Sequence, residues 1–165
     1  MRARTLRLFY SADSPEMTHF PHARNVGPCT ALALSPLHAR PLALIVEDHE
    51  DTRFLFSTLL ERRGLRVVEA EDGFAGVRAA EELRPDLILM DWSMPGMDGL
   101  KAMRLIRERD SLSEIPVIII SGYADPESRE TALVMGCCEY LVKPLDFDQL
   151  DRALRKHLLL RMVSL

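Results

Sequence analysis

Five strand-like segments alternate with five helix-like segments between residues 41 and 160 of the chain. The strand-like segments lie at residues 42–46, 66–69, 86–90, 116–120 and 139–142, and most of them are continuous apolar runs. Such runs are typical of strands that are buried on both faces of a sheet. Regular alternation of strands with helices favours parallel strands joined by right-handed crossovers. The pattern therefore predicts an α/β fold with a doubly wound, five-stranded parallel sheet.

Start and stop signals mark the helix-like segments, which lie at residues 50–63, 73–83, 99–109, 125–136 and 146–158. Asp125 offers a capping acid, and Pro126 suits the first helical position. Asp146 precedes Gln149 by three residues, the spacing of a capping box. Gly64 is typical of a helix stop.

The first 40 residues differ from the rest in charge and pattern. They hold five arginines and two acids, a net charge of 5 − 2 = +3, whereas residues 41–165 hold 16 basic and 23 acidic residues, a net charge of 16 − 23 = −7. They lack sustained periodicity, so residues 1–40 are expected to be a disordered or wrongly assigned leader, and residues 41–165 one domain. The apolar run Ala31 to Leu34 is too short for a secretory signal. A cytoplasmic protein with reduced thiols is expected.

Composition excludes several other classes of protein. Three cysteines in 165 residues do not make a disulfide-stapled fold. No stretch approaches the roughly 18 apolar residues of a membrane-spanning helix. The balance of 21 basic against 25 acidic residues does not indicate a nucleic-acid-binding protein.

Polar side chains stand at the carboxyl ends of four predicted strands. Glu47 and Asp48 follow the first strand, Asp91 the third, Ser121 the fourth and Lys143 the fifth. In parallel sheets these ends meet at one edge, where ligands bind. Three close carboxylates favour a hard divalent cation such as Mg²⁺. A carboxylate can also act as a nucleophile and form an acyl phosphate, a role that suits Asp91.

Four short motifs at these strand ends resemble the receiver domain of bacterial two-component response regulators, of the stand-alone chemotaxis type. They are Val46-Glu47-Asp48, the string DWSMPGMDG at residues 91–99, residues 120–122 (ISG) and residues 140–144 (YLVKP). The resemblance covers about three quarters of the chain. It implies a flavodoxin-like (βα)5 fold with the strand order 2-1-3-4-5.

The resemblance also implies roles for the acids. Asp91 is expected to be the phosphoacceptor. Asp48 is expected to bind Mg²⁺ directly and Glu47 through water, with Asp91 and the backbone carbonyl of Ser93 as further ligands. Position 47 is Glu where the family more often has Asp, so its contact with the metal is expected to be less direct.

Further roles fall on the last two strand ends. Ser121, where the family often has Thr, is expected to sense the phosphoryl group, and Lys143 is expected to pair with that group. The Lys143–Pro144 peptide is expected to be cis. Tyr140 is the expected aromatic switch. Ser93 and Tyr123 are expected to tune the lifetime of the phosphoaspartate. Several simpler interpretations stay open: Asp91 or Asp48 as a helix cap, Lys143 as a solvated surface lysine, and Tyr140 as half-buried packing.

The resemblance implies a single-domain response regulator that is not an enzyme. It would take its phosphoryl group from a histidine kinase or a phosphotransfer protein. It would signal to a protein effector through the face formed by the helix at 125–136, the strand at 139–142 and the last helix, because only residues 161–165 follow the domain. Direct contact with nucleic acid or membrane is not expected. Whether Leu158 and the apolar residues after it form core, a homodimer face or a partner site stays open.

Two other functions remain as alternatives. The first is a pseudo-receiver that binds partners without phosphorylation. The second is a phosphatase of the haloacid-dehalogenase type, which shares an Asp nucleophile, Mg²⁺ and Lys. The order Glu47-Asp48-His49 lacks the D-x-D spacing of that family, so the phosphatase is disfavoured.

Overall fold

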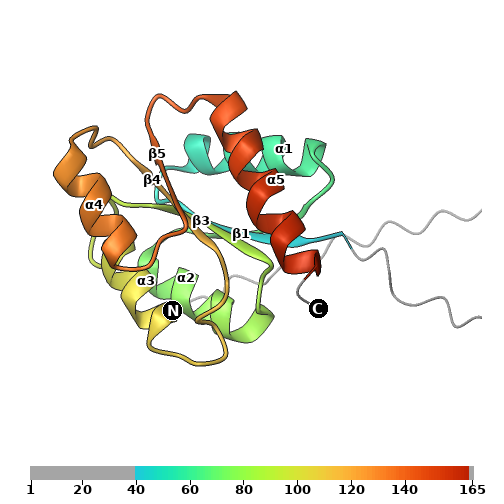
Figure 1. Ribbon diagram of the computed structural model, residues 1–165, viewed down its shortest axis with the longest axis horizontal. Helices are drawn as coiled ribbons and strands as arrows, with labels where there is room; N and C mark the ends of the chain where they lie inside the picture. The colour runs from blue at the N-terminus through green and yellow to red at the C-terminus, as the bar shows by residue number, and fades with distance from the viewer. Residues whose placement is uncertain (1–39, 164–165) are drawn as a thin grey trace, which may run out of the picture. The chain divides into compact units, whose positions relative to one another are not determined.

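A parallel sheet forms the centre of the domain (Figure 1). It has five strands, in the order β2-β1-β3-β4-β5. The computed structural model describes residues 40–163, with side chains described up to residue 158. The strands are β1 (Leu42–Val46), β2 (Arg66–Ala70), β3 (Leu87–Asp91), β4 (Val117–Ser121) and β5 (Glu139–Val142). The predicted α/β fold and its order 2-1-3-4-5 are confirmed.

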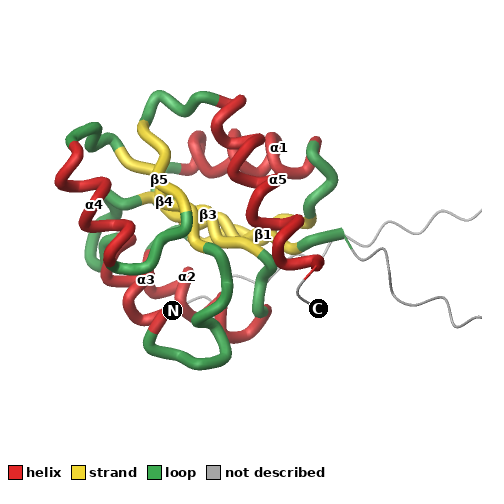
Figure 2. The backbone as a smooth tube through the Cα atoms, in the orientation of Figure 1, coloured by secondary structure: helices red, strands yellow, loops and turns green. Residues whose placement is uncertain are grey.

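Helices cover the two faces of the sheet, as Figures 1 and 2 show. They are α1 (Glu50–Arg62), α2 (Gly73–Leu83), α3 (Gly99–Arg107), α4 (Pro126–Val134) and α5 (Phe147–Val163). The helices α1 and α5 lie on one face, while α2, α3 and α4 lie on the other.

Alternating strand residues build the two halves of the core. On β1, Ala43 and Ile45 pack with Phe56 and Leu60 of α1, whereas Leu44 and Val46 belong to the cluster on the opposite face. Successive side chains of a strand point to opposite faces, so a strand covered on both sides must be apolar throughout. All five residues of β1 are buried, as the continuous apolar run predicts.

Aspartates begin three of the helices. The side chains of Asp72, Asp98 and Asp125 accept hydrogen bonds from backbone N–H groups in the first turns of α2, α3 and α4. The predicted cap at Asp125 is confirmed, with Pro126 as the first helical residue. Asp146 likewise accepts from the N–H of Asp148 at 2.8 Å. The caps at Asp72 and Asp98 were not predicted.

Most element ends differ from the predicted ones by at most two residues, but α5 ends at Val163, five residues beyond the predicted end at residue 158. Asp91 and Ser121 are the last residues of β3 and β4 instead of following them. The helix α4 ends at Val134, before Gly136, which has a φ of +104° that an L side chain rarely adopts. No helix among residues 40–163 is long and apolar enough to cross a bilayer. The expected leader lies outside the described residues.

Candidate functional site

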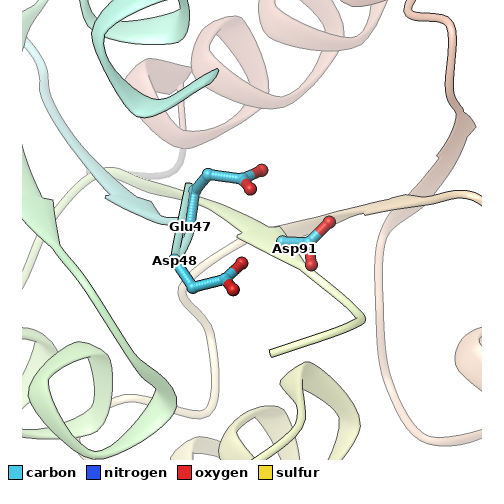
Figure 3. Close-up of side chains that lie close together, drawn as sticks. All are labelled: Glu47, Asp48 and Asp91. Carbon is cyan, nitrogen blue, oxygen red and sulfur yellow. The ribbon is translucent and has the colours of Figure 1, made fainter. Parts of the chain in front are cut away.

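Three carboxylates meet at the carboxyl ends of β1 and β3 (Figure 3). Glu47 and Asp48 follow β1 directly, and Asp91 ends the neighbouring strand β3. One carboxylate oxygen from each of the three lies within 4.8 Å of the others. Glu47 and Asp91 are 1% and 3% exposed, and Asp48 is half-buried. The parallel topology therefore brings together the acids that the sequence places at strand ends.

The ammonium of Lys143 joins this cluster from the end of β5. Its Nζ lies 2.6 Å from Asp91 Oδ1 and 3.0 Å from Glu47 Oε2. The backbone N–H of Lys143 donates to the carbonyl of Ser121 at 2.7 Å, and the peptide bond to Pro144 is cis, as expected. A solvated surface role for Lys143 is thus excluded, because its side chain pairs with two buried acids.

Burial and ion pairing act in opposite directions on the charges of the site. Burial raises the pKa of the Glu47 carboxyl above its usual value, the hydrogen bond from Lys143 opposes this, and the Asp91 carboxylate adds to it. Burial alone would lower the pKa of Lys143, but hydrogen bonds to Asp91 and Glu47 outweigh it, so this pKa is raised. The site therefore favours the charged form of Lys143 and disfavours the ionised form of Glu47.

The donor set fits a hard divalent cation. Three carboxylates face one ammonium, so negative charge is in excess where their oxygens converge. Mg²⁺ prefers oxygen ligands and binds through one or two carboxylates together with waters and phosphate oxygens. Glu47, Asp48 and Asp91 would hold it. Ser93, whose carbonyl was predicted as a further ligand, is an exposed residue two positions after Asp91.

Two residues that the sequence reasoning missed fix the loops of the site. Arg53 of α1 donates from Nη1 to the carbonyls of Glu47 at 2.7 Å and Asp48 at 3.2 Å. At Gly99, a Cβ atom would lie 2.1 Å from the carbonyl oxygen of Asp91. Only glycine permits this approach of α3 to the end of β3. The glycine of the DWSMPGMDG string was a usable signal, whereas nothing in the sequence pointed to Arg53.

A hydrogen-bonded path leads from Ser121 to Tyr140. The Oγ atom of the buried Ser121 accepts from the N–H of Tyr123 at 3.0 Å. The hydroxyl of Tyr140 donates to the carbonyl of Tyr123 at 2.7 Å, and Tyr140 is 2% exposed. The ring of Trp92, next to Asp91, meets Tyr123 and Tyr140 edge-on, with centroids 5.5 and 6.0 Å apart. Tyr140 is therefore fully buried and bonded, not half-buried packing.

Neither Asp91 nor Asp48 is the N-cap residue of a helix. The cap of α3 is Asp98, not Asp91, and the N-cap residue of α1 is His49, not Asp48. Tyr123, a predicted tuning residue, is 50% exposed. Its backbone N–H contacts Ser121, and its role in setting the lifetime of the phosphoaspartate stays a prediction.

Comparisons with known proteins identify the group of proteins that this chain resembles. Residues 43–155 match the family profile of the response regulator receiver domain. The polar-differentiation response regulator DivK of Brucella anthropi is 33% identical over 115 residues, which are 70% of this chain and 94% of DivK. The regulatory protein AtoC of Escherichia coli (strain K12) is 34% identical over 121 residues, covering 73% of this chain and 26% of AtoC.

A solved structure is similar in fold and in sequence. It is the receiver domain of the sensor histidine kinase PA1611 from Pseudomonas aeruginosa PAO1, with a magnesium ion coordinated in the active site cleft. The TM-score is 0.67 at 35% identity, and the match covers 73% of this chain and 98% of that one. The chain spans less than half the length of AtoC and of several other curated relatives that it matches.

Proposed function

The chain belongs to the response regulator receiver family, and on that premise we propose that Asp91 accepts a phosphoryl group in a Mg²⁺-dependent reaction. The donor would be a histidine kinase or a histidine phosphotransfer protein. The observation that carries this proposal is the pairing of Lys143 with Asp91 at 2.6 Å inside the three-carboxylate cluster. Receivers act mainly as signalling modules, and the proposal gives this chain the same role.

The residues of the site divide the work of the transfer. An oxygen of the Asp91 carboxylate attacks phosphorus, and the P–N bond to the donor imidazole breaks, so that the ring nitrogen keeps the electron pair. Lys143 balances the negative charge that then accumulates on the phosphoryl oxygens. The oxygen of Ser121 already accepts from Tyr123, so its O–H is available to donate to a phosphoryl oxygen.

Mg²⁺, when bound, would neutralise the phosphoryl oxygens and hold them in line for attack. Glu47, Asp48 and Asp91 are the ligands that we assign to it. Two considerations support the assignment: the convergence of their oxygens within 4.8 Å and the magnesium ion in the related PA1611 receiver domain. The carbonyl of Ser93 completes the proposed ligand set.

The output would be a conformational change that reaches an effector through α4, β5 and α5, which we call the output face. Ser121 moving toward the phosphoryl group would loosen its bond to Tyr123 and with it the position of Tyr140. We place this signalling in the cytoplasm. Ser93 and Tyr123, near the path of a hydrolytic water, are proposed to set the lifetime of the phosphoaspartate.

Intact mass spectrometry tests the proposal directly. The parent and Asp91→Asn are incubated with a small phosphodonor, with Mg²⁺ or with a chelator. One added phosphoryl group is expected in the parent with Mg²⁺ and in no other sample. No added mass in the parent, even with a cognate kinase, would favour the pseudo-receiver, and steady release of inorganic phosphate from a small phosphoester would favour the phosphatase.

A further inference from the structure

A groove of about 390 Å³ lies on the output face, where β5 forms the edge of the sheet. Figure 1 shows β5 between α4 and α5. The groove is lined by Arg129 of α4, Glu139 and Tyr140 of β5, and Arg152 and Lys156 of α5. Three cations and one acid therefore surround it, within a domain whose overall charge is negative.

The charges in the groove are not all balanced. Lys156 pairs with Glu139 at 3.3 Å, and His157 Nε2 lies 3.5 Å from the same carboxylate oxygen. Among the described residues, neither Arg129 nor Arg152 forms an ion pair with a carboxylate. Both side chains belong to exposed residues. The groove thus presents two guanidinium groups whose positive charge no carboxylate among the described residues balances.

Guanidinium groups select a particular kind of anion. Their planar donors match carboxylate and phosphate oxygens, and they bind them in pairs of parallel hydrogen bonds. A polyanion such as nucleic acid would also meet the excess of acids on the rest of the domain, where residues 41–165 carry 16 − 23 = −7. A short acidic segment can reach the groove without that repulsion.

The groove is also in contact with the predicted switch residue. Arg129 donates from Nη1 to the carbonyl of Tyr140 at 3.3 Å, and its guanidinium lies 6.0 Å from the centroid of the Tyr140 ring. A carboxylate that draws Arg129 away from these contacts changes the surroundings of Tyr140. Binding in the groove and the position of Tyr140 are therefore linked.

We propose that this groove binds an acidic segment of a partner protein, whose carboxylates pair with Arg129 and Arg152. The proposal rests on the output face assigned above and defines the chemistry of the partner that this face accepts. Lys156 takes part less strongly, because Glu139 already balances it.

Fluorescence anisotropy with a short labelled peptide rich in glutamate tests this site on the full chain. The control peptide has every glutamate replaced by glutamine. Saturable binding is expected for the glutamate peptide and not for the glutamine control peptide. Arg129→Gln and Arg152→Gln should each weaken it about tenfold, the size of a lost charge-assisted contact. Arg155→Gln removes the same charge from another exposed position of α5, on a different groove, and should change affinity less than about twofold.

A variant that gains affinity separates an effect on the groove from a loss of binding caused by misfolding. Glu139→Gln removes the only acid that lines the groove and releases Lys156 from its ion pair. The glutamate peptide should then bind about threefold more tightly, by the size of one exposed charge interaction. Unchanged or weaker binding by Glu139→Gln would overturn the proposal.

Three other results would also overturn it: no saturable binding, equal losses in Arg152→Gln and Arg155→Gln, or tighter binding of a single-stranded oligonucleotide that depends on the same arginines. The last would identify a nucleic-acid surface. The peptide titrations use unphosphorylated protein, and phosphorylation is followed separately by mass. Failure of the groove and failure of Asp91 to accept phosphate are therefore distinguishable.

Discussion

The buried carboxyl of Glu47 carries a negative charge that the fold disfavours and that a bound cation would balance. Its pKa is raised from the ordinary value of 4.5 because burial outweighs the hydrogen bond from Lys143. The native state therefore holds the proton of the Glu47 carboxyl more tightly than the unfolded chain does. The stability that this provides is complete below pH 4.5 and is lost as the pH rises through the higher native pKa. Without metal, the fold therefore favours a neutral side chain over an ionised one at this position.

Glu47→Gln should consequently raise the melting temperature at pH 7 in the presence of a chelator. The gain should shrink as the pH is lowered toward 4.5, where the parent carboxyl also carries a proton. Thermal unfolding across this pH range measures both. Glu71→Gln, at an exposed loop position, is the control and should show no such trend. A variant that is less stable than the parent at pH 7 in chelator would contradict this account.

At Gly99, the space available for a side chain determines the effect of a substitution. The Cβ of an alanine there would meet the Asp91 carbonyl oxygen at 2.1 Å, so the loop after β3 must move. Gly99→Ala should reduce the free energy of unfolding by about 1–3 kcal/mol, the usual cost of overpacking. Urea denaturation measures it. Gly122→Ala, where nothing lies within 4 Å of the added Cβ, should fall within about 0.5 kcal/mol of the parent.

The helices differ in how firmly the core holds them. Ala132 is the one buried residue of α4, whereas α3 buries five residues. An element with so little buried apolar surface opens at low free energy. Amides in α4 should therefore exchange with deuterium faster than those in α3, a difference that native-state exchange followed by mass spectrometry detects. Equal protection of the two helices would show that α4 is held by contacts other than burial.

Arg107 connects the end of α3 to the turn between α4 and β5. Its guanidinium donates to the carbonyl of Gly136 at 3.0 and 2.9 Å and to that of Ile115 at 2.9 Å. Arg107→Leu should cost about 1–3 kcal/mol of stability, because the partly buried carbonyl groups that it contacts lose their donors. Arg104→Leu, on an exposed arginine of the same helix, should cost less than about 1 kcal/mol by the same denaturation measurement. Equal costs would mean that the carbonyl contacts do not matter.

At the scale of the whole molecule, topology made much of the site predictable. Asp91 and Lys143 are far apart in the sequence, but parallel strands end at one edge, so the sequence predicts that they meet. The contacts of Arg53, Arg107 and Trp92 were not predictable in this way. They depend on how long side chains cross between elements, and neither periodicity nor capping signals carry that information. Sequence patterns specify where backbone elements end, while the cross-links between them follow from packing.

The site and the output face are joined through the contacts of Tyr140, the predicted switch residue, and this leads to a prediction about coupling. If phosphorylation of Asp91 changes the affinity of the groove for the glutamate peptide, the peptide must change the stability of the phosphorylated state by the same factor. The connection runs through the hydroxyl of Tyr140, which holds the carbonyl of Tyr123.

Tyr140→Phe removes that hydroxyl but keeps the buried ring and the backbone carbonyl that Arg129 contacts. We expect the variant to accept phosphate on Asp91 and to bind the peptide when unphosphorylated. Its peptide affinity should respond to phosphorylation less than that of the parent, in which coupling of about 1–3 kcal/mol is typical of linked sites. Titrations of both proteins, with and without phosphate, measure the difference. An equal response in the two would place the connection in the edge-on contact of Trp92 with Tyr140, which the substitution leaves intact.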